Sequence, residues 1–169
     1  MGPGWAMRRY AASAELENIG NAGKDRRSSR EKHRQGNCVM YRAVTRDIEV
    51  VVTPRFVADR SSPENNYFFW AYTISITNNG HETVQLKTRH WRITDAHGRK
   101  QEVRGAGVVG EEPVLKAGEV FEYTSGVPLQ TPSGFMVGSY GMVSAAGEHF
   151  DIEVPAFSLD SGVTKRTLN

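Results

Sequence analysis

One segment of the chain alternates large apolar residues with smaller or polar ones at a period of two. It is the segment 67–80, YFFWAYTISITNNG, and the apolar residues on one side of it are Phe68, Trp70, Tyr72, Ile74 and Ile76. Successive side chains of a β-strand point to opposite faces, whereas a helix would distribute these side chains over every side. Asn78, Asn79 and Gly80 then supply a turn signal. The sequence therefore predicts a long strand with one buried face, which a second layer must cover.

Five further segments show the strand pattern, and one of them contains two strands. They are 47–57 (DIEVVVTPRFV), 83–105 (TVQLKTRHWRITDAHGRKQEVRG, with a turn at 95–98), 120–127 (VFEYTSGV), 135–143 (FMVGSYGMV) and 149–159 (HFDIEVPAFSL). No stretch of any length has helical periodicity. Seven strands joined by short turns predict an all-β chain, namely an antiparallel immunoglobulin-like or fibronectin type III-like β-sandwich of seven to eight strands.

The chain divides into parts of different composition. Its first 46 residues hold ten Lys and Arg against four Asp and Glu, whereas the rest of the 169 residues holds eleven against fifteen. Residues 1–40 have few large apolar side chains, so we predict a disordered basic tail, with Met40 as an alternative translation start. A solvated extension is favoured over a nucleic-acid contact for this tail. Residues 41–160 are the predicted domain and residues 161–169 a flexible C-terminus.

Cysteine usage and hydropathy indicate where the chain works. Cys38 is the only cysteine, so an intramolecular disulfide is excluded and a reducing, cytoplasmic compartment is expected. The sequence has neither a run of 18 apolar residues nor the apolar core of a secretory signal. We therefore predict no membrane insertion.

The stretch 105–110, GAGVVG, fits the pattern G-x-G-x-x-G of dinucleotide-binding proteins. That mechanism needs a helix after the glycines, but Pro113 and Gly118 prevent a useful one. Glu111 and Glu112 would also place two negative charges beside a polyphosphate. A structural loop is the favoured interpretation, with Val108 and Val109 closing the end of the sandwich.

Two functional hypotheses for this loop stay open. The loop is either a contact patch for a protein partner or an anion site made by turned backbone amides. The residues assigned to it are Arg104, Gly105, Gly107, Val108, Val109, Gly110 and Lys116, with Arg89 as a further candidate for the anion site.

The sequence carries no signature of a metal site or of catalysis. Its histidines, at positions 33, 81, 90, 97 and 149, show no pairwise ligand spacing, although His90 and His97 flank a turn. The serines lack a G-x-S-x-G elbow. Tyr123 and Tyr140 are expected to combine apolar burial with a tethered hydroxyl. We predict a non-enzymatic chain without metal or cofactor.

Three motifs stand in register along the chain: HWxITDxxG from His90, VxGxGVVGxxPxLxxGxxFxYTSGxPLxTPSGxMxGxY from Val103, and PxFSL from Pro155. In these motifs the chain resembles the ApaG family over about residues 41–159. Phe135 and Val137 depart from the family pattern, in which charged or small residues often stand. The resemblance implies a fibronectin type III-like sandwich.

The resemblance also implies an association with cobalt tolerance and magnesium efflux, without an established biochemical mechanism. The same domain occurs in eukaryotic interaction proteins, including certain F-box proteins and a polymerase-delta-interacting protein. We therefore expect a non-catalytic binding module with an unidentified protein partner. A homodimer is compatible with this interpretation, nucleic acid is disfavoured, and a nucleotide or pyrophosphate sensor that uses the loop 105–110 is the alternative.

Overall fold

The computed structural model describes residues 39–162, and most of the predicted tail and of the predicted flexible C-terminus lies outside this range. Within the described residues the nine strands are β1 (Tyr41–Thr45), β2 (Ile48–Phe56), β3 (Phe68–Asn78), β4 (Val84–Asp95), β5 (Lys100–Ala106), β6 (Val114–Leu115), β7 (Val120–Leu129), β8 (Ser133–Ser144) and β9 (His149–Asp160). Two short 3-10 helices, η1 (Ala58–Arg60) and η2 (Pro63–Asn65), separate β2 from β3. All seven predicted strands are present, and β1 and β6 are additional.

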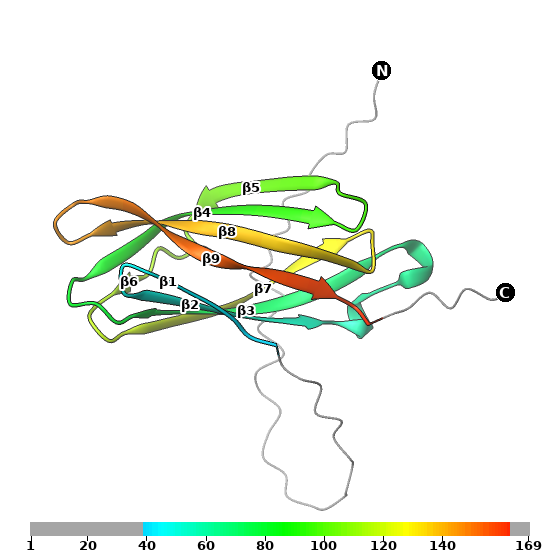
Figure 1. Cartoon of the computed structure of the whole chain (residues 1–169), viewed down its shortest axis with the longest axis horizontal. Helices are drawn as coiled ribbons and strands as arrows, with labels where there is room; N and C mark the ends of the chain where they lie inside the picture. The colour runs from blue at the N-terminus through cyan, green and yellow to red at the C-terminus, as the bar shows by residue number, and fades with distance from the viewer. Residues whose placement is uncertain (1–38, 163–169) are drawn as a thin grey trace, which may run out of the picture.

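The strands form two antiparallel sheets that pack face to face as a sandwich (Figure 1). One sheet has the order β1-β2-β3-β7, and the other has the order β5-β4-β8-β9 with β6 paired to the start of β4. All-β class and sandwich architecture were therefore predicted correctly from the period-two pattern. Strand β6 escaped prediction because it is two residues long and directly follows a proline.

The core lies between the inner faces of the two sheets and contains the alternate residues that the pattern selected. On β3, Ile74 and Ile76 are fully buried and Trp70 is 1% exposed. Trp91 of β4 makes edge-to-face contacts with Tyr72, Tyr140 and Phe157, at centroid distances of 5.7, 6.0 and 6.1 Å. Such pairs add to the free energy gained from apolar burial, so aromatic side chains from both layers hold the sandwich together.

Phe69 lies on the outer face of β3, opposite the core, and yet it is only 8% exposed. The segment between β2 and β3 covers it, and the guanidinium of Arg60 lies 4.2 Å from the ring centroid. Gly126 of β7 makes room for the ring, since a Cβ there would lie 2.3 Å from Phe69 Cζ. This part of the outer face is therefore filled by the chain itself.

The two long edges of the sandwich differ. At one edge β9 lies against β1 and β2, and the Glu153 N–H donates to Thr45 Oγ1 at 3.1 Å. The strands at the other edge are β5 and β7, one from each sheet. The segment 105–110 follows β5 at this second edge.

Candidate functional site

The segment after β5 forms a tight hairpin, which we call the 107–111 hairpin. Val108 N–H donates to Glu111 O, and Glu111 N–H donates to Val108 O, both at 2.8 Å. Between them Val109 has a φ of 44° and Gly110 a φ of 81°. Positive φ at both central residues defines a type I′ turn. The glycine-rich stretch is therefore a turn of a β-protein, and a helix start is absent from it.

The two adjacent valines of this hairpin have different environments. Val108 is fully buried and belongs to the hydrophobic core, whereas Val109 is 38% exposed at the tip. The interpretation that both valines close the sandwich end is therefore right for Val108 and wrong for Val109. A β-branched residue with positive φ is uncommon because its Cβ crowds the backbone. Val109 thus stands in a strained conformation that the surroundings impose.

The first two glycines of the pattern are needed for close approach. Gly107 has a φ of 57°, and a Cβ there would lie 2.2 Å from Glu111 O. A Cβ on Gly105 would lie 3.0 Å from the Arg89 guanidinium. Both positions face neighbours within the same chain, so the glycines serve the construction of the hairpin.

Arg89 of β4 holds the base of the hairpin, at Ala106 and Gly107, by hydrogen bonds. Its Nη1 donates to Ala106 O at 2.8 Å and to Gly107 O at 2.7 Å. Lys87 contributes twice, because its carbonyl accepts from Gly107 N–H at 2.8 Å and its ammonium pairs with Glu112. Hydrogen bonds from a charged donor are among the stronger ones. The backbone of the hairpin is therefore held firmly while its tip stays exposed.

This geometry does not favour an anion site. In the described part of the chain the N–H groups of Gly107, Val108 and Glu111 already donate to carbonyls, which leaves the adjacent amides of Val109 and Gly110. Glu112 also approaches Gly107, since a Cβ on that glycine would lie 3.3 Å from Glu112 Cγ. A carboxylate at this position opposes a phosphate.

The two cations assigned to the loop do not come together. Arg104 lies opposite His90 on β4, whereas Leu115, next to Lys116, lies opposite Val84. Six residues of one strand separate these positions, which corresponds to roughly 20 Å. Arg104 is also paired with Glu102 at 2.7 Å. The structure therefore brings five of the seven assigned residues into one stretch around the hairpin and places Arg104 and Lys116 apart.

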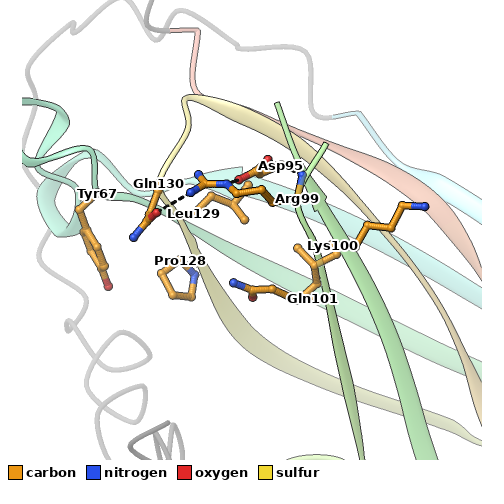
Figure 2. A pocket seen from close by; sticks show the side chains of 9 residues that line it. Tyr67, Asp95, Arg99, Lys100, Gln101, Pro128, Leu129 and Gln130 are labelled. Carbon is orange, nitrogen blue, oxygen red and sulfur yellow. Dashed lines mark hydrogen bonds and ion pairs between the residues drawn. The ribbon is translucent and has the colours of Figure 1, made fainter. Parts of the chain in front are cut away.

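A pocket of about 480 Å³ lies at the far end of the β5 and β7 edge, and no sequence pattern pointed to it (Figure 2). Arg99 crosses its rim, with Nε donating to Asp95 Oδ2 at 2.6 Å and Nη1 donating to Gln130 Oε1 at 3.0 Å. Partial burial raises the pKa of Asp95, but hydrogen bonds from Arg99 and from the His97 N–H outweigh this and hold the pKa below its usual value. Arg99 and Asp95 of the rim thus satisfy each other.

Tyr123 and Tyr140 are both buried with tethered hydroxyls, as expected, and their pairing with each other is a finding of the structure. The hydroxyl groups of Tyr123 and Tyr140 lie 2.5 Å apart and join β7 to β8 across the sandwich. Burial raises the pKa of both phenols well above its usual value. Burial likewise raises the pKa of Tyr72. These hydroxyls remain protonated, so the pair is structural, as the sequence suggested.

The described residues contain no group of three or more His, Cys, Asp or Glu side chains that could hold a metal ion. His90 and His97 do not meet across their turn. His90 Nε2 lies 2.5 Å from Glu102 Oε1, whereas His97 lies in the turn itself, where its N–H donates to Asp95 Oδ1 at 2.9 Å. Within residues 39–162, no helix is long and apolar enough to cross a membrane.

The sandwich and its hairpin define a class, namely a small fibronectin type III-like β-domain with a conformationally fixed loop at one edge. The family model described as the ApaG domain matches residues 58–144. The chain belongs to the ApaG family.

Its relatives support this assignment over the whole domain. Protein ApaG of Bradyrhizobium diazoefficiens and Protein ApaG of Rhodopseudomonas palustris are each 68% identical over 130 residues, which cover 77% of this chain and 100% of the relative. A crystal structure of a Bordetella pertussis protein described as ApaA is 48% identical, with a TM-score of 0.67, and the match covers 72% of this chain and 96% of that one.

Proposed function

We propose that this protein is a non-catalytic binding module that contacts a protein partner through the tip of the 107–111 hairpin. The observation that carries the proposal is the conformation of Val109, an exposed β-branched residue at a φ of 44°. Asn, Asp or Gly would occupy this turn position with less strain. Backbone strain of this kind is concentrated at functional sites. An apolar side chain kept at a strained, exposed tip is suited to recognition.

The support beneath the tip favours binding without rearrangement. Arg89 holds the carbonyls at the base, and Val108 anchors the hairpin in the core. A loop that is already ordered loses little conformational entropy when a partner binds. The hairpin therefore presents Val109 and Gly110 as a preformed contact surface.

The association with cobalt tolerance and magnesium efflux, which the family resemblance implies, would then be indirect. We propose that the module acts in the cytoplasm on a protein that controls cation transport, and that the ions themselves bind elsewhere. The proposal needs neither a cofactor nor a metal ligand of this chain.

The test begins with a photo-crosslinking amino acid placed at position 109 of the full chain in cells. The matched control carries it at Val120, which is 58% exposed on the other sheet. The partner captured at position 109 is purified, and its affinity is measured for the wild type, Val109→Asp and Val120→Asp. We expect Val109→Asp to weaken binding at least tenfold and Val120→Asp less than twofold, with both variants folded. Equal affinity of Val109→Asp and wild type would reject the proposal.

The alternative function, a nucleotide or pyrophosphate sensor, is tested separately by an amide-resolved NMR titration. The ligands are pyrophosphate and ATP, each with and without magnesium. We expect no saturable shifts at millimolar ligand, because three amides of the hairpin already donate to carbonyls. Saturable shifts confined to residues 104–116 would establish the anion site in place of the partner contact.

A further inference from the structure

The outer face of the β5-β4-β8-β9 sheet carries three parallel strips of different character, and this face is remote from the core. Its residues alternate with buried ones such as Trp91, Met136 and Ile152. The β5 and β4 side is basic, since Arg92, Lys100 and Arg104 outnumber its one carboxylate, Glu102. The β8 strip contains no charged residue. The β9 strip contains Asp151, Glu153 and Asp160 but no Lys or Arg.

The strand register shows how the two charged strips are related. Arg104 lies opposite His90, His90 opposite Ser139, and Ser139 opposite Glu153. One row across the sheet therefore begins with a cation on β5 and ends with a carboxylate on β9. Three strand spacings separate them, roughly 14 Å, so Arg104 does not pair with Glu153 within the chain. Arg104 pairs instead with Glu102 of its own strand, and Arg92 and Lys100 leave this side with a net positive charge.

The uncharged strip between them exposes an aromatic side chain. Phe135 of β8 is 47% exposed on the outer face, while its neighbour Met136 is 1% exposed in the core. Val137, two residues further on, is half-buried on the same outer face. Aromatic side chains are enriched in the centres of protein interfaces and are costly to leave in water. The middle of this face therefore has the composition of the centre of a protein interface.

We propose that a second copy of this chain packs on this face, related by a two-fold axis parallel to the strands. Rotation about that axis exchanges the two sides of the sheet, so the basic strip of each copy meets the acidic strip of the other. A two-fold axis perpendicular to the strands would instead place the basic strip of one copy on the basic strip of the other. Phe135 then lies in the apolar middle of the contact in both copies.

The size and charge of the face agree with this occupant. The strands β4, β5, β8 and β9 have 12, 7, 12 and 12 residues. At the usual rise per residue and strand spacing they give a face of roughly 700 Å², close to the about 800 Å² that each partner contributes to a standard interface. A polyanion such as nucleic acid or an anionic membrane would meet the basic strip but would be repelled by Asp151 and Glu153. A second copy matches both strips at once.

The experiment is sedimentation equilibrium of the full chain between 10 µM and 1 mM at low salt. The wild type is expected to dimerise reversibly, and Phe135→Ser to raise the dissociation constant at least tenfold. Val120→Asp, an exposed change on the other sheet, is expected to leave it unchanged. A wild type that stays monomeric at 1 mM, or equal weakening by Val120→Asp and Phe135→Ser, would overturn the proposal.

A charge exchange tests the axis itself. Arg104→Glu and Glu153→Lys each place like charges opposite one another twice in a homodimer, so each variant alone is expected to be monomeric. In an equimolar mixture, the new carboxylate of the first variant faces the new ammonium of the second, and the unchanged Glu153 and Arg104 form the native pair. Association is therefore expected to return in the mixture and to weaken in 0.5 M salt. Two monomeric variants whose mixture also stays monomeric would exclude this symmetry.

Discussion

Strand β5 lies between two turns that are stabilised in different ways. At its start, the turn from Asp95 to Arg99 is held chiefly by its own residues, because the Asp95 carboxylate accepts from the N–H groups of His97 and Arg99. Ala96 N–H adds an outside contact, to Thr131 Oγ1 at 3.1 Å. At its end, the 107–111 hairpin is held by residues from elsewhere, chiefly Arg89 and Lys87 of β4. The first turn is encoded locally and the second by tertiary contacts. The strained residue, Val109, lies in the hairpin that depends on hydrogen bonds from β4.

The largest effect is expected from a charge at the buried end of the hairpin. Val108→Asp places a carboxylate in the core and should cost at least about 4 kcal/mol of unfolding free energy. Val109→Asp, one residue away at the exposed tip, should not destabilise the fold, because Asp-Gly also suits a type I′ turn. Chemical denaturation of both variants measures the difference. Equal destabilisation would show that the tip is also part of the core.

Replacement of one glycine in each turn compares how much the turns before and after β5 contribute to stability. Gly107→Ala meets Glu111 O at 2.2 Å and a positive φ, so we expect a loss of about 2–4 kcal/mol. Gly98→Ala also has a positive φ, of 77°, but open space around it, and should cost about 1 kcal/mol. Thermal unfolding of the two variants gives the ranking. A reversed ranking would contradict the close approach of Gly107 to Glu111.

Relief of strain at the tip should have the opposite sign. Val109→Asn creates Asn-Gly, the sequence that a type I′ turn favours, and is expected to stabilise the fold by about 1 kcal/mol. The same change should weaken partner binding, because it removes the apolar contact. Denaturation and the affinity assay measure the two effects on one variant. Stabilisation without loss of affinity would separate the strain from recognition.

The smallest effect belongs to the locally held turn and appears only in acid. The folded-state pKa of Asp95 is lowered, so its contribution to stability is present above its unfolded value of about 3.8 and is lost as pH falls through the folded value. Asp95→Asn should therefore flatten the acid limb of a plot of stability against pH. Its partner Arg99 is 54% exposed, so solvent screens the ion pair and the change is small. An unchanged acid limb would mean that the turn does not depend on this carboxylate.

Local sequence patterns predicted the strands but not the tertiary contacts that hold the loops and align the strands. The alternation on β3 identified Trp70, Ile74 and Ile76 as core residues, because a strand has one period wherever it lies. The role of Arg89 depends on a hydrogen bond to Gly107 across 18 residues of sequence, which no local pattern reveals. Similarly, the strip pattern of the outer face emerges only when the register aligns β5, β4, β8 and β9.

The hydrogen bond between Tyr123 and Tyr140 has a mechanical consequence. It joins β7 of one sheet to β8 of the other, within a core that is otherwise filled by apolar side chains. Shear of the layers by one residue would separate the hydroxyls and leave two buried polar groups unpaired, at about 1–3 kcal/mol for each. The bond therefore fixes the register of one layer on the other and opposes their sliding.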